Sequence, residues 1–132
     1  MDEMKLTNNF YLKEFESKDG ADTPEDVLHN LRLLTEQLQI LRDYTGLPIK
    51  INSGYRSPYY NDVVLPSRGI KASKNSQHKL GKAADIVIVG LKPFETYALI
   101  EYLIDKGVLK IGGLGSYKTF THLDIRTKKA RW

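Results

Sequence analysis

Cysteine is absent from this chain of 132 residues, so neither a disulfide framework nor a thiolate metal site can form. Any metal ion must therefore be held by histidine and carboxylate side chains, and the chain has only three histidines. The absence of thiols does not indicate the compartment, because a chain without cysteine can work in a reducing or an oxidising environment.

Long apolar runs are absent too. No stretch is long enough to span a membrane, and residues 1–9 lack the apolar core of a signal peptide. We therefore expect synthesis in the cytoplasm and no membrane partner. The hydrophobic fraction of 41% and the charged fraction of 27% are ordinary for a globular protein, and the length fits one domain over residues 1–132.

The positive net charge of +4 is partly concentrated near the C-terminus, in Arg126, Lys128, Lys129 and Arg131. Such a basic segment can contact nucleic acid or an anionic wall polymer, or it can simply be a solvated terminus. No nucleic-acid-binding motif accompanies it, so we prefer the solvated terminus and expect no nucleic-acid partner.

Hydrophobic periodicity predicts an α+β fold, in which a small antiparallel sheet is flanked by helices. Leucines recur at spacings of three and four in the first helix, and a glycine follows it. Alternating or continuous apolar runs mark the strands. The expected elements are helices over 24–44, 58–63 and 93–106, strands over 48–52, 82–89 and 120–126, a polar loop over 64–77, and a glycine-rich connection over 112–115.

Two histidines and one aspartate form a candidate metal site. His78 precedes a predicted strand that contains Asp85, and His122 lies on another strand, which can pair antiparallel with the first. Two imidazoles and one carboxylate suit Zn²⁺ with an open position, which is typical of catalytic zinc. The alternatives for a buried Asp85 are a salt bridge or a turn cap. His29, on the long helix, is expected to be structural.

Ordered sequence blocks give the chain its resemblance to a known family. Residues 76–85, SQHKLGKAAD, resemble the S-x-H-x-x-G-x-A-x-D signature of the zinc D-Ala-D-Ala carboxypeptidases. SGYRSPYYN at 53–61, GGLGSY at 112–117 and THLDIR at 121–126 resemble further blocks of the same family. Residues 6–15 look like the opening of small phage or prophage members, so the resemblance covers nearly the whole chain.

This resemblance implies the fold shared by D,D-peptidases and the hedgehog domain, with a zinc ion held by His78, Asp85 and His122 on one face of the sheet. It also implies a monomeric peptidase that acts on peptidoglycan stem peptides, as a carboxypeptidase or as an endopeptidase. The apparent lack of a leader fits a phage or prophage lysin that is released to the wall. It fits equally a cytoplasmic peptidase that trims recycled muropeptides.

The catalytic base is where the chain departs from several relatives, which carry a carboxylate three residues before the last histidine. That position is Thr119 here, and threonine has no useful acid-base pKa. Asp124 is the expected substitute, because it lies two residues after His122 and shares its face on a strand. Alternatively, Asp124 orients a histidine ligand or pairs with Arg126.

Arg56 is expected to bind a substrate carboxylate or the developing oxyanion through its planar fork. A surface arginine that stabilises its turn is the alternative. Further substrate contacts, each with an ordinary turn or packing role as its alternative, are expected from Ser53, Tyr55, Ser76, Gln77 and Tyr117.

A second class of function is a catalytically inactive, zinc-containing module that binds the cell wall or belongs to a phage structure. The hedgehog domain shows, by resemblance, that such a zinc site need not belong to a working peptidase. The loss of the carboxylate at Thr119 points the same way.

Overall fold

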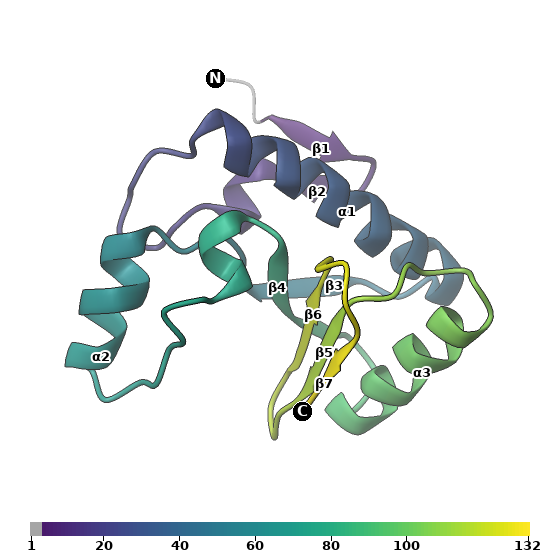
Figure 1. The fold of residues 1–132 in the computed structure, drawn as a ribbon. Helices are drawn as coiled ribbons and strands as arrows, with labels where there is room; N and C mark the ends of the chain where they lie inside the picture. Colours follow the sequence, from purple (N-terminus) through teal and green to yellow (C-terminus); the bar gives the residue numbers. More distant parts are fainter. Residues whose placement is uncertain (1–3) are drawn as a thin grey trace.

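A five-stranded sheet forms the centre of the molecule in the computed structural model, which describes residues 4–132 (Figure 1). Its strand order is β3-β4-β6-β5-β7, and a separate two-stranded sheet joins β1 to β2. The strands are β1 (Lys5–Thr7), β2 (Phe10–Tyr11), β3 (Ile49–Ser53), β4 (Ala83–Ile88), β5 (Gly113–Ser116), β6 (Thr121–Asp124) and β7 (Ala130–Arg131). The predicted α+β class is confirmed, as are the three predicted strands, which correspond to β3, β4 and β6.

The expectation of a purely antiparallel sheet is wrong at one edge, where β5 and β7 pair in parallel. The reason is the order of the chain. β6 runs antiparallel to β5, and β7 reverses direction again before it pairs on the outer side of β5. The predicted connection over 112–115 is also wrong in part, because Gly113–Ser116 forms strand β5.

Helices connect these strands. The long helix α1 (Glu25–Thr45) ends at Gly46, whose φ of 67° lies in the left-handed region that glycine tolerates. A π-helix, η2 (Tyr60–Val64), leads directly into α2 (Leu65–Ser67), so the loop predicted from residue 64 begins only after Ser67. The others are α3 (Pro93–Asp105) and two 3₁₀ helices, η1 (Leu12–Phe15) and η3 (Gln77–Leu80). None of the described helices is long and apolar enough to cross a membrane.

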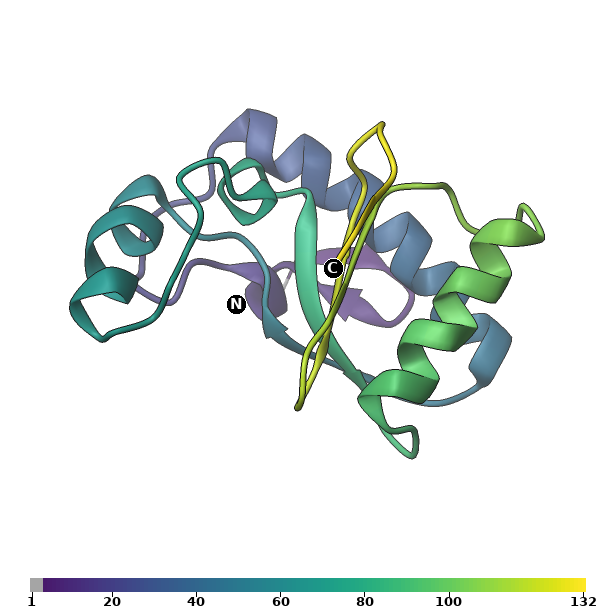
Figure 2. The same cartoon turned by 60° about the horizontal axis from the view of Figure 1, so that its bottom comes forward.

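The hydrophobic core lies between the helices α1 and α3 and one face of the sheet. Figure 2 shows the sheet nearly edge-on, with α3 on one side and α2 on the other. Because successive residues of a strand point to opposite faces, alternate strand residues enter this core. The fully buried contributors include Leu31, Leu34, Leu38 and Leu41 of α1, Ile86 and Ile88 of β4, Ile100 and Leu103 of α3, and Leu114 of β5.

The intervening strand residues form the second face, which is polar. Asp85 lies between Ala84 and Ile86, two core residues, and Leu123 separates His122 from Asp124 in the same way. All three polar side chains are nevertheless buried. Such residues are costly to bury without partners, so this face must satisfy them within a polar network.

Gly81 provides a test of the close packing between the end of η3 and α1. Its φ is 75°, and a Cβ at this position would lie 2.7 Å from Val27 Cγ1 and 2.8 Å from Val27 O. We expect Gly81→Ala to lower the free energy of unfolding by about 2 kcal/mol or more, since it adds overpacking to the cost of a left-handed alanine. Urea denaturation measures this loss.

Gly46→Ala is the matched control. Gly46 has a similar φ of 67°, but a Cβ there would meet nothing within 4 Å. This variant should therefore lose only the backbone contribution, about 1 kcal/mol. Equal losses in the two variants would contradict the close packing of Gly81 against α1.

Candidate metal centre

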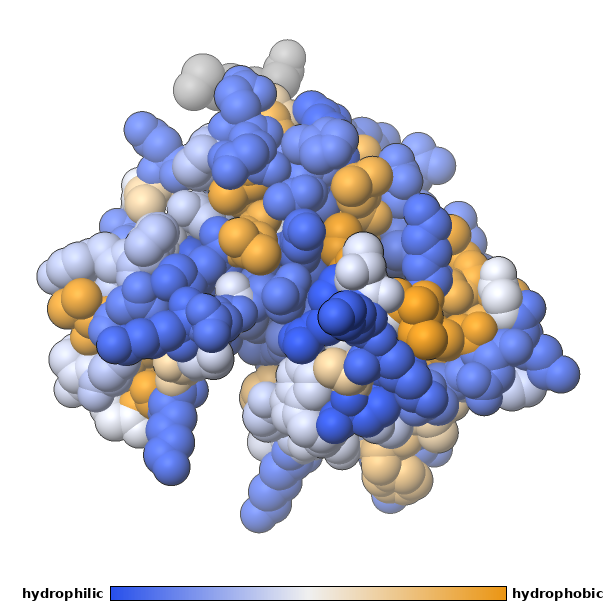
Figure 3. Space-filling model, in the orientation of Figure 1, coloured by the Kyte–Doolittle hydropathy of each residue, from blue (hydrophilic) through white to orange (hydrophobic). Residues whose placement is uncertain are grey.

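A cavity of about 490 Å³ opens on the polar face of the sheet. One side is formed by Arg56 and the loop over 70–78, and the other by side chains from 117–132. Figure 3 shows the corresponding hollow between the part of the molecule that contains α2 and the C-terminal strands. Its volume is in the range of small-molecule and peptide sites.

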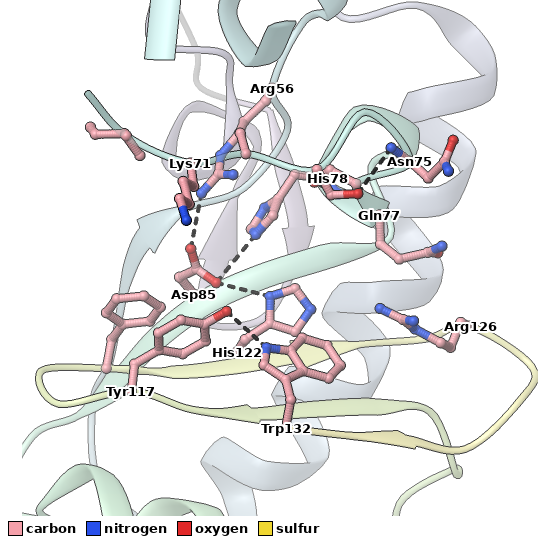
Figure 4. A pocket seen from close by; sticks show the side chains of 15 residues that line it. Arg56, Lys71, Asn75, Gln77, His78, Asp85, Tyr117, His122, Arg126 and Trp132 are labelled. Atoms are coloured by element: carbon pink, nitrogen blue, oxygen red, sulfur yellow. Dashed lines mark hydrogen bonds and ion pairs between the residues drawn. The ribbon is translucent and has the colours of Figure 1, made fainter. Parts of the chain in front are cut away.

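The three predicted ligands meet at the base of this cavity. His78 comes from η3, Asp85 from β4 and His122 from β6, and their ligand atoms all lie within 4.8 Å of one another. Asp85 pairs directly with His122 across the two strands, as predicted. His78 Nε2 lies 3.2 Å from Asp85 Oδ1, and His122 Nδ1 lies 3.1 Å from the same oxygen (Figure 4).

The outward nitrogen of each imidazole is held by a hydrogen-bond acceptor. His78 Nδ1 donates to the main-chain oxygen of Gly54 at 2.7 Å, and His122 Nε2 donates to Asp124 Oδ2 at 2.8 Å. A carbonyl or carboxylate oxygen can only accept, so these contacts assign the proton to the outward nitrogen of each neutral ring. His78 Nε2 and His122 Nδ1, which face Asp85, are then the nitrogens that can bind a metal ion, and the outward contacts orient both rings for it.

Three possible metal-ligand atoms therefore converge, and when no ion is bound, a proton on a facing nitrogen lets that ring donate to Asp85. Burial lowers the pKa of His78, and the hydrogen bond to Asp85 offsets this only in part. Burial also acts to lower the pKa of His122, but its contacts with Asp124 and Asp85 outweigh this and raise it. Two nitrogens and one carboxylate oxygen fit a divalent metal ion well.

The salt bridge considered as an alternative for Asp85 is present together with this arrangement. Arg56 Nη2 lies 3.1 Å from Asp85 Oδ2, the oxygen that does not face the histidines. Burial alone would raise the pKa of Asp85, but hydrogen bonds from His122 and His78 hold it well below its usual range. Asp85 is thus a carboxylate with one oxygen held by Arg56 and the other oriented toward the metal position.

Both carboxylate oxygens of Asp124 already accept hydrogen bonds. Oδ1 accepts from the main-chain nitrogen of Gly113 at 2.9 Å, and Oδ2 accepts from His122 and, at 2.6 Å, from Arg126 Nη2. Although burial opposes it, hydrogen bonds from His122 and Arg126 hold the pKa of Asp124 well below its usual range. These contacts favour the orienting role over the base role, because a base needs a free oxygen.

The other predicted site residues divide into two groups. Arg56, Ser76, Gln77 and Tyr117 line the cavity. Ser53 does not, although its Oγ accepts a hydrogen bond from Arg56 Nε at 3.1 Å. Tyr55 is only 4% exposed and packs in the hydrophobic core, so the packing alternative fits it.

The cavity residues that the sequence analysis did not predict come from the loop over 70–75 and from the C-terminal part of the chain. Arg126 and Trp132 line the cavity, as do Lys71 and Asn75 from the opposite loop. The solvated-terminus interpretation is wrong for Arg126, which binds Asp124, and for Arg131, which binds Glu101 at 2.8 Å. The one feature of the sequence that could have drawn attention to Trp132 is that it is the single tryptophan of the chain.

A sequence model described as Peptidase M15 matches residues 4–124, which include all three candidate ligands. No curated protein matches the chain. Because the match covers most of the sequence, the chain belongs to the Peptidase M15 family, the zinc D-Ala-D-Ala carboxypeptidase-like family, and it is a metallopeptidase in class. His78, Asp85 and His122 can hold the metal ion on which such peptidases depend.

Metal binding should stabilise the fold, because the three ligands join separate segments. At a free metal concentration about 100 times Kd the gain is about 2.7 kcal/mol, which corresponds to a rise in Tm of about 5 °C or more. Differential scanning fluorimetry with Zn²⁺ and Co²⁺ measures it. His122→Ala should abolish the rise, whereas His29→Ala, which removes an exposed histidine from α1, should keep it. An equal rise in both variants would place the metal elsewhere.

The contacts of Asp124 lead to a second expectation. Asp124→Asn should lower metal affinity by about 10- to 100-fold, the usual effect of losing the acceptor behind a histidine ligand. Isothermal titration calorimetry provides the affinity. Asp62→Asn, which changes an aspartate paired with Lys79 outside the cavity, is the control. Unchanged affinity together with a turnover lowered by about 10² would restore the base role for Asp124.

Proposed function

We propose that this protein is a zinc-dependent peptidase that hydrolyses peptide bonds in bacterial peptidoglycan stem peptides and acts as a monomer. The observation that carries the proposal is the convergence of His78 Nε2, Asp85 Oδ1 and His122 Nδ1 beside an open cavity. Two imidazoles and one carboxylate are the ligands of catalytic zinc sites, which keep one position open.

The charges around the cavity support an anionic substrate. Arg56, Lys71 and Arg126 all line it, and Asp85 has the only acidic side chain among the described lining residues. Since Asp85 is already paired with Arg56 and belongs to the metal site, the cationic side chains create a positive potential inside the cavity. Stem peptides carry several free carboxylates, so they match this potential.

Zinc, when bound, supplies a Lewis acid that polarises a scissile carbonyl and lowers the pKa of water toward neutrality. The chain supplies orientation. Arg56 uses Nε for Ser53 and Nη2 for Asp85, which fixes the plane of its guanidinium and leaves other N–H donors for the substrate. A fixed fork of this kind suits a substrate carboxylate or a developing oxyanion.

The inactive wall-binding or phage structural module remains a second candidate, and one observation favours it. No described residue that lines the cavity has a free acidic side chain, and Thr119 is exposed in the turn between β5 and β6 rather than in the cavity. A peptidase must therefore transfer the proton of the attacking water through a side chain that already has partners in the site, or through the substrate. A binding module has no such requirement.

Digestion of purified muropeptides separates the two candidates. The zinc-loaded protein is expected to cleave them and the chelated protein is not, and mass spectrometry of the products identifies the bond and whether cleavage is terminal or internal. Arg56→Lys should lower kcat/KM by about tenfold or more, because lysine keeps the charge but loses the bidentate geometry. Arg68→Lys, at an exposed position outside the cavity, is the control.

One outcome would contradict the proposed peptidase, and another would contradict only the role of Arg56. Binding of muropeptides by the zinc-loaded wild type without any cleavage would favour the module. Full activity in Arg56→Lys would remove Arg56 from substrate recognition, although the peptidase itself would stand.

A further inference from the structure

Trp132 is a large aromatic side chain that lies exposed beside a metal ligand. It lines the cavity, its ring centroid is 4.9 Å from that of His122, and 45% of its surface is accessible. Exposed aromatic residues are common on protein surfaces, and exposure alone has no functional meaning. What distinguishes Trp132 is how firmly its indole is held.

Three contacts fix the indole. Its Nε1 donates to the hydroxyl oxygen of Tyr117 at 2.8 Å, and the guanidinium of Arg126 lies 5.2 Å from the ring centroid, in a cation–π arrangement. One face of the ring packs directly on Gly115, where a Cβ would lie 2.5 Å from Nε1. Glycine at this position therefore lets the indole rest on β5.

The backbone of Trp132 is held equally well. Its nitrogen donates to Leu114 O at 3.2 Å, and its oxygen accepts from Ser116 N at 2.7 Å, so the residue continues the pairing of β7 with β5. The preceding Arg131 makes two 2.8 Å contacts with Glu101 of α3. A preorganised side chain loses little conformational entropy when a ligand covers it, and this favours binding.

The cavity consequently has two chemically different sides. Trp132, Tyr117 and Phe120 form an aromatic wall, in which the rings of Tyr117 and Phe120 stack at 4.4 Å. Figure 4 shows Trp132 and Tyr117 on one side of the metal ligands, with Arg56 and Lys71 on the opposite side. A ligand that fills this space therefore needs one apolar face and one anionic edge.

We propose that Trp132 is a substrate-binding residue, against which the small aliphatic side chains of the stem peptide pack next to the cleaved bond. This inference rests on the proposed function, which supplies the peptide. The aromatic wall would receive the methyl groups of alanine residues, while Arg56 and Lys71 hold the carboxylates. The wall then favours aliphatic over charged side chains, because a charged side chain would lose its hydration against the indole.

Kinetics with a synthetic stem pentapeptide ending in D-Ala-D-Ala test the inference. Trp132→Ala should raise KM by about tenfold or more and change kcat less, since the contact is made with bound substrate. Trp132→Phe should stay within about threefold of the wild type, because an aromatic ring remains. Gly115→Ala keeps the tryptophan but places a methyl group against its indole. The displaced indole should raise KM.

Tyr102→Ala is the matched control. Tyr102 is 50% exposed on α3 and has Lys106 over its ring at 5.6 Å, so it resembles Trp132 in exposure and in its cation–π partner but does not line the cavity. Its removal should leave KM unchanged. Circular dichroism establishes that each variant is folded, and if Trp132→Ala is not, Trp132→Phe and Gly115→Ala carry the test.

Fluorescence provides a readout that is independent of turnover. Trp132 is the only tryptophan of the chain, so its emission reports on this wall alone. A saturable change on addition of the pentapeptide to metal-free protein, absent with free acetate, is expected. Unchanged KM in Trp132→Ala, with an active wild type and unchanged emission, would overturn the inference and leave the peptidase intact. A wild type that neither binds nor cleaves the peptide would overturn the proposed function, and the inference with it.

Discussion

The register between β4 and β6 is the constraint on which the site depends. Asp85 stands opposite His122, and the neighbouring pair, Ala84 and Leu123, faces the core. A slip of one residue would turn Asp85 into the leucine-rich core and expose core residues to the cavity. The cost of an unpaired buried carboxylate therefore protects the register, and the same alternation that builds the core also builds the metal centre.

The support of the metal centre extends far along the chain. Gly54, whose oxygen holds His78, lies so close to η1 that a Cβ would be 2.7 Å from Phe15 Cα, and Tyr55 N donates to Phe15 O at 2.7 Å. At the other end, Arg126 holds Asp124, which holds His122. The supports of the three candidate ligands therefore extend from η1 to Arg126, well beyond the ligand segments themselves.

Local patterns in the sequence predicted what depends on local geometry. The convergence of His78, Asp85 and His122, the long helix and the shared face of His122 and Asp124 follow from short motifs and from the period of two in a strand. The edge strand β7 and the place of Trp132 could not be found in this way, because two residues show no period and their position depends on Arg131 reaching Glu101, 30 residues away. Pro66 lies within the predicted loop over 64–77, but in the structure it falls where the π-helix η2 passes into α2.

The pairing of each site carboxylate with its own guanidinium has a consequence for inhibition. Asp85 is matched by Arg56 and Asp124 by Arg126, so the four side chains cancel in charge. A divalent ion at this centre would keep both of its positive charges uncompensated within a largely buried setting, where electrostatic attraction is weakly screened. Inhibitors that present a doubly charged anion to the metal should therefore bind more tightly than neutral chelating groups of the same size. Because the site is largely buried, high salt should weaken their binding less than it weakens the binding of anions to an exposed site.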